Sequence, residues 1–495
     1  MGQHFKDTKT ICERSSVSRQ AVVRVGGRNP ARKCVVPLEK FKTNDLMPSL
    51  KQHAIDIVRT LRAHGHQAYL VGGCVRDLLL GREPADYDVS TDATPAEVTR
   101  IFPRTYAVGA QFGVVLVPVR DGVNSTVEVA TFRSDIGYSD GRHPDEVRFS
   151  NSAQEDVERR DFTINGLLFD PVKNEFLDFV GGKKDLEAGI IRTIGPADLR
   201  FTEDKLRMLR AVRFAARFGY TIEAETFAAI QRLAAGVDQI SRERVRDELT
   251  KMLTEGHARR AFLLLDETGL LQNVLPEISA MKGVQQPAEF HPEGDVFVHT
   301  LLLLENLPQP CPPTLAWGAL LHDVGKPPTF RIAPDRIRFD NHVDVGVKMA
   351  EEICRRLRFS NDDTEQILAL VANHMRFSHV SQMKDSTFKR FVRMPHFDQH
   401  LELHRLDCRA SHRNLASYNL TRERIAATPP EAIRPAPLIS GGDLIAAGYL
   451  PGPRFKEILA HVEDAQLEGR LQSKDSALEH VKRKFPLEAS HSRQN

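Results

Sequence analysis

The chain has 495 residues, of which 41% are hydrophobic and 27% are charged, a composition typical of a globular protein with about three domains. The net charge of only +2 excludes binding of nucleic acid through overall charge, so any nucleic-acid surface is expected to be local. The six cysteines form no CxxC pair and no apolar run approaches the roughly 18 residues of a membrane span, which predicts a cytoplasmic chain with no membrane partner.

Residues 1–46 are polar, rich in Arg and Lys, and without helical or strand periodicity. A segment of this composition is expected to be a disordered extension, or to precede a working start at Met47. A basic arm that contacts RNA is the alternative. Asp7 and Glu13 interrupt the basic stretch and argue against a transit peptide.

The next segment, residues 47–195, has the mixed pattern of an α/β head domain built from a mixed sheet and helices. Apolar residues at helical spacing predict a helix over residues 50–64, and a short apolar run predicts a strand over residues 67–72. The elements expected after these are a helix over 74–81 and strands near 86–90, 105–108, 113–119 and 126–132.

The rest of the chain is predicted to be helical, in three parts. Residues 196–286 have helical periodicity with short breaks and are expected to form an all-α neck and body. Pro287 and Pro292 mark a boundary, and residues 287–427 are again helical but unusually rich in histidine. The Pro-rich stretch TPPEAIRPAP opens the final part, residues 428–495, which is expected to be a linker and a small helical tail.

Two short motifs in the head carry groups that bind phosphate and metal ions. Gly72 and Gly73 follow the predicted strand and open a helix, where backbone N–H groups bind phosphate. Asp86 and Asp88 alternate along the next predicted strand, so their carboxylates share one face and require a cation such as Mg²⁺ between them. With Arg76 just beyond the glycines, the combination predicts a site for a triphosphate and Mg²⁺, although each motif by itself is more often structural.

Two later motifs carry groups suited to recognising a nucleotide. Arg160 and Asp161, followed by Asn165, offer donors and acceptors for ribose hydroxyls, which would reject deoxynucleotides. Asp204 and Arg207 belong to an EDxxR motif and are expected on one face of a helix. There the carboxylate accepts and the guanidinium donates, a pattern that fits cytosine and adenine and refuses guanine and uracil. A surface salt bridge between these two side chains is the structural alternative.

The helix that carries Arg207 continues with three more arginines, and together they fall within an arc of about 120°. These additional residues are Arg210, Arg213 and Arg217. Their guanidinium groups are available either to a base or phosphate or to structural ion pairs. Glu128, on a predicted strand of the head, is a further acidic candidate for the site.

These motifs resemble, in order and wording, the class II tRNA nucleotidyltransferase and poly(A) polymerase family of the polymerase-beta-like superfamily. The segments that also carry the resemblance are VEVATFRSD (127–135), YSDGRHP (138–144), EDVERRDFTINGLLFD (155–170), TIGPADLRFTEDKLRMLRAVRFAARFGY (193–220) and SGGDLIAAGYLPGP (440–453). The resemblance implies that Asp86 and Asp88 bind the metal ion. It implies also that the triphosphate is handled by Gly72, Gly73 and Arg76.

The function that the resemblance implies is template-independent addition of CCA to the 3′ end of tRNA from CTP and ATP. The family uses the RRDFTxNA segment for sugar recognition, and Gly166 stands where its members usually have alanine. Residues 133–148 correspond to a mobile family loop that helps to switch from C to A addition, and their wording resembles CCA-adding enzymes more than poly(A) polymerases. A poly(A) polymerase, or an enzyme that adds only part of CCA, is the alternative within the family.

The histidine-rich part contains a series of residues with the composition of a metal site. In chain order the series is His299, His322, Asp323, His342, His374 and Asp407. Imidazoles with a bridging carboxylate suit Mn, Fe, Ni or Zn, and six candidates are enough for two metal ions. A single histidine on a helix is usually structural, so the prediction depends on the whole series.

The series resembles the HD phosphohydrolase superfamily, which implies that Asp323 bridges two metal ions and that Lys326 binds substrate phosphate. The sets that the resemblance implies are His299, His322 and Asp407 for a first metal ion and His342 and His374 for a second. Some bacterial relatives carry such a domain, which acts on 2′,3′-cyclic phosphates and 3′ ends, so trimming or repair of RNA ends is implied. The alternatives are a degenerate helical domain kept for folding or tRNA docking, and a hydrolase whose nucleotidyltransferase module only binds RNA.

Overall fold

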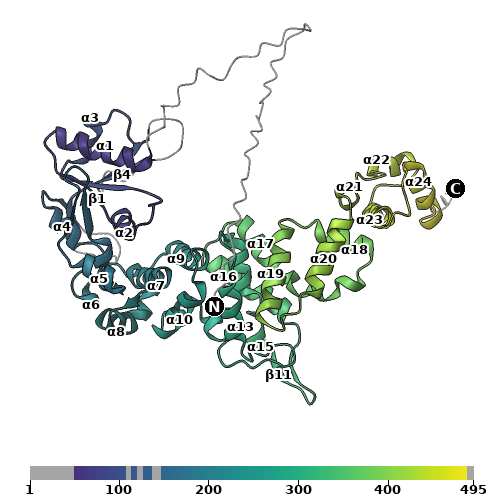
Figure 1. Ribbon diagram of the computed structural model, residues 1–495. Coiled ribbons are helices and arrows are strands. Elements are labelled where there is room, and N and C mark those ends of the chain that lie inside the picture. The colour runs from purple at the N-terminus through teal and green to yellow at the C-terminus, as the bar shows by residue number, and fades with distance from the viewer. Residues whose placement is uncertain (1–48, 107–112, 120–125, 137–145, 488–495) are drawn as a thin grey trace, which may run out of the picture. The chain divides into compact units, whose positions relative to one another are not determined.

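The computed structural model describes residues 49–106, 113–119, 126–136 and 146–487 (Figure 1). The extension expected over residues 1–46 and the centre of the loop expected over 133–148 lie outside these ranges. The two ends of that loop form an antiparallel pair of strands, β5 (Arg133–Ile136) and β6 (Glu146–Phe149).

A six-stranded mixed sheet forms the head, which confirms the predicted α/β class. Its strands are β1 (Ala68–Val71), β2 (Asp88–Thr91), β3 (Val114–Pro118), β4 (Thr126–Thr131), β7 (Leu167–Asp170) and β8 (Glu175–Asp178). Their order in the sheet is β3-β4-β2-β1-β7-β8, where β2 and β4 are parallel and the other neighbours are antiparallel.

Helices cover both faces of this sheet. Successive side chains of a strand point to opposite faces. Leu70 of β1 accordingly packs in one buried cluster with Val58 of α1 (Leu50–Ala63). Val71, the next residue, packs in another cluster with Val157 of α4 (Ala153–Glu158). The strand is therefore buried on both sides, which fixes the positions of the groups at its end.

Two strand predictions for the head differ from the structure. The strand expected near residues 86–90 begins only at Asp88, so Asp86 precedes it. The strand expected near 105–108 is represented, within the described residues, by a single bridge between Tyr106 and Leu116. Short edge segments of this kind have too little periodicity to be predicted from sequence.

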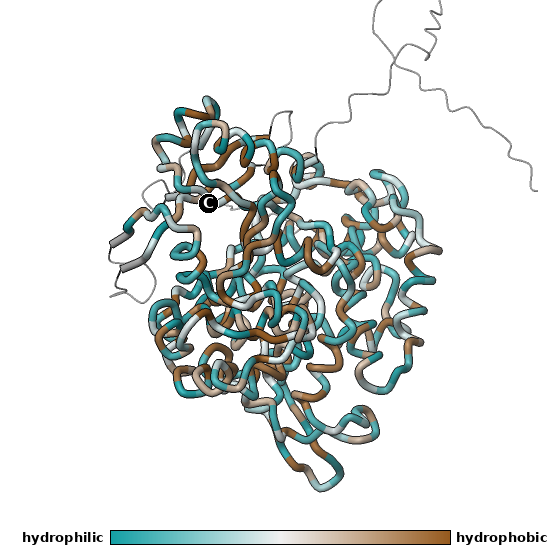
Figure 2. Tube along the Cα trace, turned by 60° about the vertical axis from the view of Figure 1, so that its left-hand side comes forward, coloured by the Kyte–Doolittle hydropathy of each residue, from teal (hydrophilic) through white to brown (hydrophobic). Residues whose placement is uncertain are grey.

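The chain beyond the head is helical, as predicted, and most of its helices alternate between apolar and polar positions (Figure 2). The helices that lead away from the sheet are α5 (Gly182–Ala188), α6 (Ala197–Glu203), α7 (Leu206–Phe218), α8 (Ala224–Leu233), α9 (Arg242–Thr254), α10 (Ala258–Glu267), α11 (Leu271–Val274) and α12 (Pro276–Ser279). Those of the histidine-rich part are α13 (Val296–Glu305), α14 (Pro313–Leu321), α15 (Lys326–Thr329), α16 (His342–Arg356), α17 (Asn361–Asn373), α18 (Asp385–Val392), α19 (Phe397–Ala410) and α20 (Ala416–Ala427). The tail contains α21 (Pro430–Ile433), α22 (Gly441–Ala446), α23 (Pro453–Leu467) and α24 (Lys474–Lys484).

One element of the histidine-rich part was not predicted. A β-hairpin made of β11 (Phe330–Ile332) and β12 (Ile337–Phe339) interrupts the helices between α15 and α16. Two other short strands, β9 (Ile190–Ile191) and β10 (Thr221–Ile222), form a parallel pair after the head sheet.

The hydrophobic core is continuous across the predicted boundary at residue 287. One cluster of buried apolar side chains runs from Ala54 to Ala410, whereas the tail has a cluster of its own. Trp317 of α14 is fully buried, and its indole N–H donates to Thr250 Oγ1 of α9 at 2.9 Å. The domain bounds remain a prediction, because packing does not stop at them. Among the described residues, none of the helices is both long and apolar enough to cross a membrane.

Candidate active sites in the head and in the histidine-rich part

The register of the sheet places the glycine turn beside the carboxylates. Val71, the last residue of β1, pairs with Asp88, and Asp88 pairs on its other side with Glu128 of β4. Gly72 follows directly, with φ 75°, as the N-cap of α2 (Gly73–Leu79). This left-handed backbone conformation favours glycine and turns the chain sharply into the helix. The turn and the carboxylates therefore share one end of the central strands, at a cavity of about 830 Å³.

The carboxylates form a cluster with unbalanced negative charge. Burial, together with the nearby Glu128 and Asp86, raises the pKa of Asp88 to about 7. Asp86 is exposed while Tyr87 beside it is buried, so the alternation predicted for a strand continues although β2 begins later. Among the described residues, no side chain donates a hydrogen bond to the carboxylate of Asp86 or Asp88. Like charges held together in this way fit a divalent cation.

The glycine turn is supported by hydrogen bonds from both sides. The Gly72 N–H donates to the Leu167 carbonyl oxygen at 3.2 Å and is therefore engaged within the protein. Any phosphate contact from this turn must come from the groups that follow it. Arg76 is buried, donates to Asn165 Oδ1 at 2.6 Å and stacks over the Phe218 ring at 4.6 Å. Its guanidinium lines the cavity and is held in place by α7.

The predicted ribose-recognising residues line the same cavity, but Arg160 and Asp161 do not pair with each other. Arg160 is bound to Asp156, with Nη2 and Oδ2 3.0 Å apart. Asp161 accepts from Arg210 Nη2 at 2.7 Å and from Asn165 Nδ2 at 3.1 Å. Burial by itself would raise the pKa of Asp161, but Arg210 and Asn165 hold it below its ordinary value. The carboxylate is therefore an ionised acceptor with a fixed orientation.

Gly166, where alanine is usual in the resembling family, lies in a tightly filled space. A Cβ atom at this position would lie 2.9 Å from Val180 Cγ2, 3.0 Å from Ile194 Cδ1 and 3.1 Å from Val157 Cγ1. Large neighbouring side chains thus occupy the volume of a methyl group. The difference from the family is a packing difference next to the site.

The prediction that Asp204 and Arg207 lie on one helix was wrong. Asp204 ends α6 with φ −143°, and α7 begins at Leu206. The Leu206 N–H donates to Asp204 Oδ1 at 3.0 Å, so this carboxylate binds the first free N–H group of the new helix from just before its N-cap, Lys205. Aspartate side chains compete for backbone N–H groups and favour helix starts over helix interiors. The EDxxR motif therefore spans a break between two helices.

The two side chains of the motif also have other partners than each other. Asp204 Oδ2 lies 2.8 Å from Nη2 of Arg244, which comes from α9. Arg207 Nη1 lies 2.7 Å from Glu203 Oε2. Asp204, Arg207 and Arg244 line the cavity, which has the size of a nucleotide site, and Glu203 does not. Arg244 was missed in the sequence, where it is one of several arginines on α9 and 40 residues from its partner.

The arginines of α7 divide between the two roles considered for them. Arg207, Arg210 and Arg217 line the cavity. Arg213 is not part of the lining, and its Nε lies 2.6 Å from Glu248 Oε2 of α9. Because Arg213 is buried and committed to this ion pair, it joins α7 to α9. Its predicted contact with a nucleotide has no support from its position.

Replacing Arg244 by alanine is expected to reduce base selectivity. Without this guanidinium, the Asp204 carboxylate loses the contact that orients it, and incorporation of UTP or GTP relative to CTP should rise about tenfold. Single-turnover incorporation of each of the four nucleoside triphosphates measures the effect. Arg242→Ala is the matched control, because Arg242 lies on the same helix but pairs with Asp238. Unchanged selectivity in Arg244→Ala would rule out this role.

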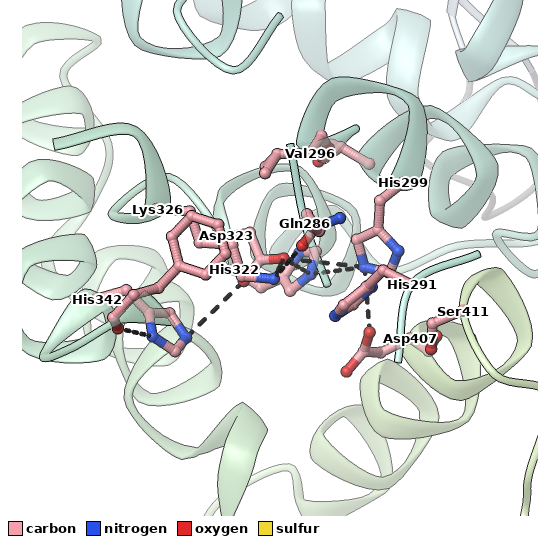
Figure 3. A network of polar contacts seen from close by, with 12 residues as sticks. Gln286, His291, Val296, His299, His322, Asp323, Lys326, His342, Asp407 and Ser411 are labelled. Atoms are coloured by element: carbon pink, nitrogen blue, oxygen red, sulfur yellow. Dashed lines mark hydrogen bonds and ion pairs between the residues drawn. The ribbon is translucent and has the colours of Figure 1, made fainter. Parts of the chain in front are cut away.

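The six predicted ligands of the second site converge at one place. Figure 3 labels all of them except His374. His299 Nε2 lies 3.1 Å from Asp407 Oδ1 and 3.3 Å from His322 Nε2. Asp323 Oδ2 lies 3.1 Å from the same nitrogen of His322. The ligand atoms of these six residues fall into two groups, each within 4.8 Å: His299, His322 and Asp407, and Asp323, His342 and His374. A third such group, His291, Glu293 and His299, adjoins the first through His299. The residues were thus correctly predicted to come together.

Each histidine is oriented by a contact of its Nδ1 atom, which leaves Nε2 facing the centre. Nδ1 of His322 donates to Ala319 O at 2.9 Å, that of His342 to Phe339 O at 2.9 Å, and that of His374 to Val371 O at 2.7 Å. A carbonyl only accepts, so the Nε2 atoms carry lone pairs. Nε2 of His342 and of His374 are buried without a hydrogen-bond partner. They lie 4.0 and 3.8 Å from Asp323 Oδ1.

This donor set fits metal ions. Histidine ligands of metals typically donate their other ring N–H to a carbonyl or carboxylate, as observed here. Burial lowers the pKa of His374 to about 4, so this imidazole is neutral near pH 7 and able to coordinate. Gly325 contributes to the geometry, since a Cβ atom there would lie 2.1 Å from the His342 carbonyl oxygen. Only glycine lets α16 and His342 approach Asp323 this closely.

Two residues that support the site, Glu293 and Gln286, were not predicted. Glu293 Oε1 lies 2.7 Å from His299 Nδ1 and 2.9 Å from His291 Nδ1. Burial would raise the pKa of Glu293, but the two histidines lower it to about 2. Lys326, predicted to bind phosphate, places Nζ 2.7 Å from Asp323 Oδ2 and 2.6 Å from Gln286 Oε1. Glu293 lies outside any recognisable helix pattern, which is why the sequence did not reveal it.

The fold and the two sites define a nucleotidyltransferase-type head followed by helical segments that hold a cluster of histidines and aspartates able to bind metal ions. Three family models match the chain in this order. They are the poly A polymerase head domain over residues 68–192, the probable RNA and SrmB-binding site of polymerase A over 219–282, and the HD domain over 296–410. Over these ranges the chain is therefore similar to the head domain and the probable RNA-binding segment of poly A polymerase, and to the HD domain.

Similar proteins agree with this assignment. The CCA-adding enzyme of Bacillus pumilus is 41% identical over 273 residues, which are 55% of this chain and 63% of that enzyme. The CCA-adding enzyme of Geobacillus thermodenitrificans is 47% identical over 219 residues, 44% of this chain and 53% of that enzyme. These alignments span between half and two thirds of the length of the relatives. A solved structure of the Bacillus stearothermophilus CCA-adding enzyme in complex with CTP has a TM-score of 0.67 at 28% identity, covering 88% of this chain and 99% of that chain.

Proposed function

We propose that this protein adds CCA to the 3′ end of tRNA from CTP and ATP. The observation that carries the proposal is the single cavity that brings Asp86 and Asp88 together with Asp204 and Arg207. The names of the similar proteins, and the CTP bound in the structure of one of them, support the same substrates. The terminal 3′ hydroxyl of tRNA attacks the α-phosphorus of the nucleotide, the bond to the β-phosphate breaks, and pyrophosphate leaves.

The head residues have distinct roles in this reaction. Asp86 and Asp88, with Glu128 beside them, would hold Mg²⁺, which supplies positive charge where the phosphoryl group is transferred. Arg76 and Arg160 provide positive charge for the triphosphate. The nucleoside is oriented by Asp161, Asn165, Asp204, Arg207 and Arg210. Arg244 holds the Asp204 carboxylate in place. No nucleic-acid template is needed, because protein donors and acceptors contact the base.

Incubation of the full chain with tRNA lacking CCA separates this function from its alternatives. With CTP and ATP together, extension by three nucleotides is expected, and with CTP alone the product should stop after two. A long tract of A from ATP alone would identify a poly(A) polymerase instead. A stop after CC with both nucleotides, or a requirement for tRNA that already ends in CC, would identify a partial CCA-adding enzyme.

We propose a second activity, hydrolysis of phosphate esters at RNA 3′ ends, including 2′,3′-cyclic phosphates, at the HD site. It is favoured by the buried, unpartnered Nε2 atoms of His342 and His374, which face Asp323. A transition metal, Mn, Fe, Ni or Zn, would be held by these residues with His299, His322 and Asp407, and would activate water for attack on phosphorus. Phosphatase activity that is lost in His322→Ala, in a protein with no nucleotide incorporation, would instead identify an RNA-binding hydrolase.

A further inference from the structure

The hairpin β11–β12 is attached to the HD site at both ends. It lies in the chain between Lys326 and His342, two residues of that site. The Phe339 carbonyl oxygen accepts from His342 Nδ1 at 2.9 Å, and the Phe339 ring lies 5.4 Å from Lys326 Nζ. Phe330, opposite Phe339 in the hairpin, packs against the same ring with centroids 6.0 Å apart. The hairpin is thus in contact with His342 and Lys326, two of the residues proposed to hold a metal ion and a phosphate.

The hairpin forms one wall of a cavity that opens from the HD site. The cavity has a volume of about 490 Å³, which is ample for a nucleotide. Asp323, His342, His374 and Asp407 lie in its lining. The hairpin side of the lining consists of Arg336, Ile337, Arg338, Phe339 and the adjoining Asp340, and Phe290 and Met375 lie elsewhere in the lining.

The charges of this wall leave a guanidinium available to a ligand. Arg338 pairs with Asp335 at 2.7 Å, and Arg336 Nε is 4.0 Å from the same carboxylate oxygen. Asp340, which also lines the cavity, is paired with Arg331, so Asp335 alone faces these two guanidinium groups, both of which are substantially exposed. The phenyl rings of Phe339 and Phe290 add flat apolar surface. Aromatic rings beside arginines are the usual means of binding single-stranded nucleic acid, by stacking of bases and contact with phosphates.

We propose that the hairpin makes the HD site selective for the 3′ end of an RNA strand over a free nucleotide. In this arrangement the terminal phosphate lies at the metal ligands, the terminal base contacts Phe339, and Arg336 and Arg338 bind the phosphate of the preceding nucleotide. A mononucleotide has no such preceding phosphate and gains nothing from the two arginines. The proposal rests on the phosphohydrolase function given above and specifies its substrate class.

The test compares two substrates in the full chain and in the double variant Arg336→Ala/Arg338→Ala. For a trinucleotide that ends in a 2′,3′-cyclic phosphate, kcat/KM is expected to fall about tenfold or more in the variant. For a 2′,3′-cyclic mononucleotide it should change less than twofold. The slope of log affinity against log salt for the 3′-phosphorylated trinucleotide should decrease by about 0.7, the value for the one phosphate that the two arginines bind. Arg331→Ala is the matched control, because Arg331 lies on the same hairpin, pairs with Asp340 and does not line the cavity.

Other outcomes overturn one proposal without the other. Equal loss of activity on both substrates would show that the hairpin is only structural. Unchanged activity on both would show that the two arginines take no part in substrate recognition. If the unaltered protein hydrolyses neither substrate with Mn²⁺, Fe²⁺, Ni²⁺ or Zn²⁺ added, the phosphohydrolase function is wrong. Binding of the 3′-phosphorylated trinucleotide, which needs no turnover, then decides the role of the hairpin by itself: weaker binding in the double variant supports it, and equal binding refutes it.

Discussion

Asp88→Asn is expected to lower incorporation of CTP and ATP into tRNA by about three orders of magnitude or more. The amide keeps the shape of the side chain but removes a carboxylate from the Mg²⁺ site, and a loss of about 4 kcal/mol of transition-state stabilisation corresponds to this factor. Incorporation of labelled nucleotide into tRNA lacking CCA measures it. Asp56→Asn, on the exposed side of α1, is the control and should be unaffected. Incorporation at the original rate would show that Asp88 is not a metal ligand.

The same variant is expected to be more resistant to heat in metal-free buffer at pH 8. Burial raises the pKa of Asp88 to about 7, above its ordinary value of 3.8. Between pH 3.8 and about pH 7 the folded chain keeps a proton on this carboxyl that the unfolded chain has released. The protonated carboxyl therefore contributes to the free energy of unfolding at low pH, and this contribution is lost as the pH rises through about 7. Asparagine never ionises and avoids the loss. The difference in melting temperature should vanish below about pH 4, and Mg²⁺ should stabilise only the original protein.

Asp323→Asn is expected to abolish phosphohydrolase activity, with a decrease of about three orders of magnitude or more, and to leave nucleotide incorporation unchanged. Asp323 is buried among His299, His322, His342, His374 and Lys326, and the pKa of its carboxyl is held well below the ordinary value although burial acts against this. Loss of this charge leaves both groups of ligands without their shared carboxylate. Metal content of the purified protein, measured beside the two activities, checks the reason for the loss.

Two histidines on one 3₁₀ helix provide a matched pair for the same prediction. His374 and His379 both lie in the segment His374–Gln382. His374 is buried with its Nε2 facing the site, whereas His379 is exposed and contacts Ser378. His374→Ala should lower both metal content and phosphohydrolase activity, and His379→Ala should change neither. Equal effects of the two substitutions would contradict the assignment of ligands.

Much of both sites followed from the sequence because their chemistry depends on residue type and short spacing. Asp86 and Asp88 next to a Gly-Gly turn, and the series from His299 to Asp407, are recognisable without coordinates. Residues of these types have few structural uses in such combinations, so the motifs identified the groups that converge. The α/β head and the helical remainder followed from periodicity in the same way, since buried faces repeat at the period of the element.

The partners of these groups were decided only by tertiary structure. Asp204 and Arg207 were expected on one face of a single helix. The structure has a break between α6 and α7, and Asp204 pairs with Arg244 and Arg207 with Glu203. Arg213, indistinguishable from Arg210 in the sequence, turns to Glu248 instead of the cavity. Such choices depend on which charged groups the packing of distant helices brings within about 3 Å, and no local pattern encodes them.

The sequence by itself thus predicted which residues come together at the two sites, because binding of phosphate, base and metal needs particular donors, acceptors and ligands. It did not determine their orientation. Glu293, Gln286 and the hairpin β11–β12 have no motif of their own, yet they fix the rings, the ammonium group and the wall of the HD site. Hydrogen bonds and close packing act over a few ångströms between segments far apart in the chain, so only the folded structure places these supporting groups beside the chemistry that they control.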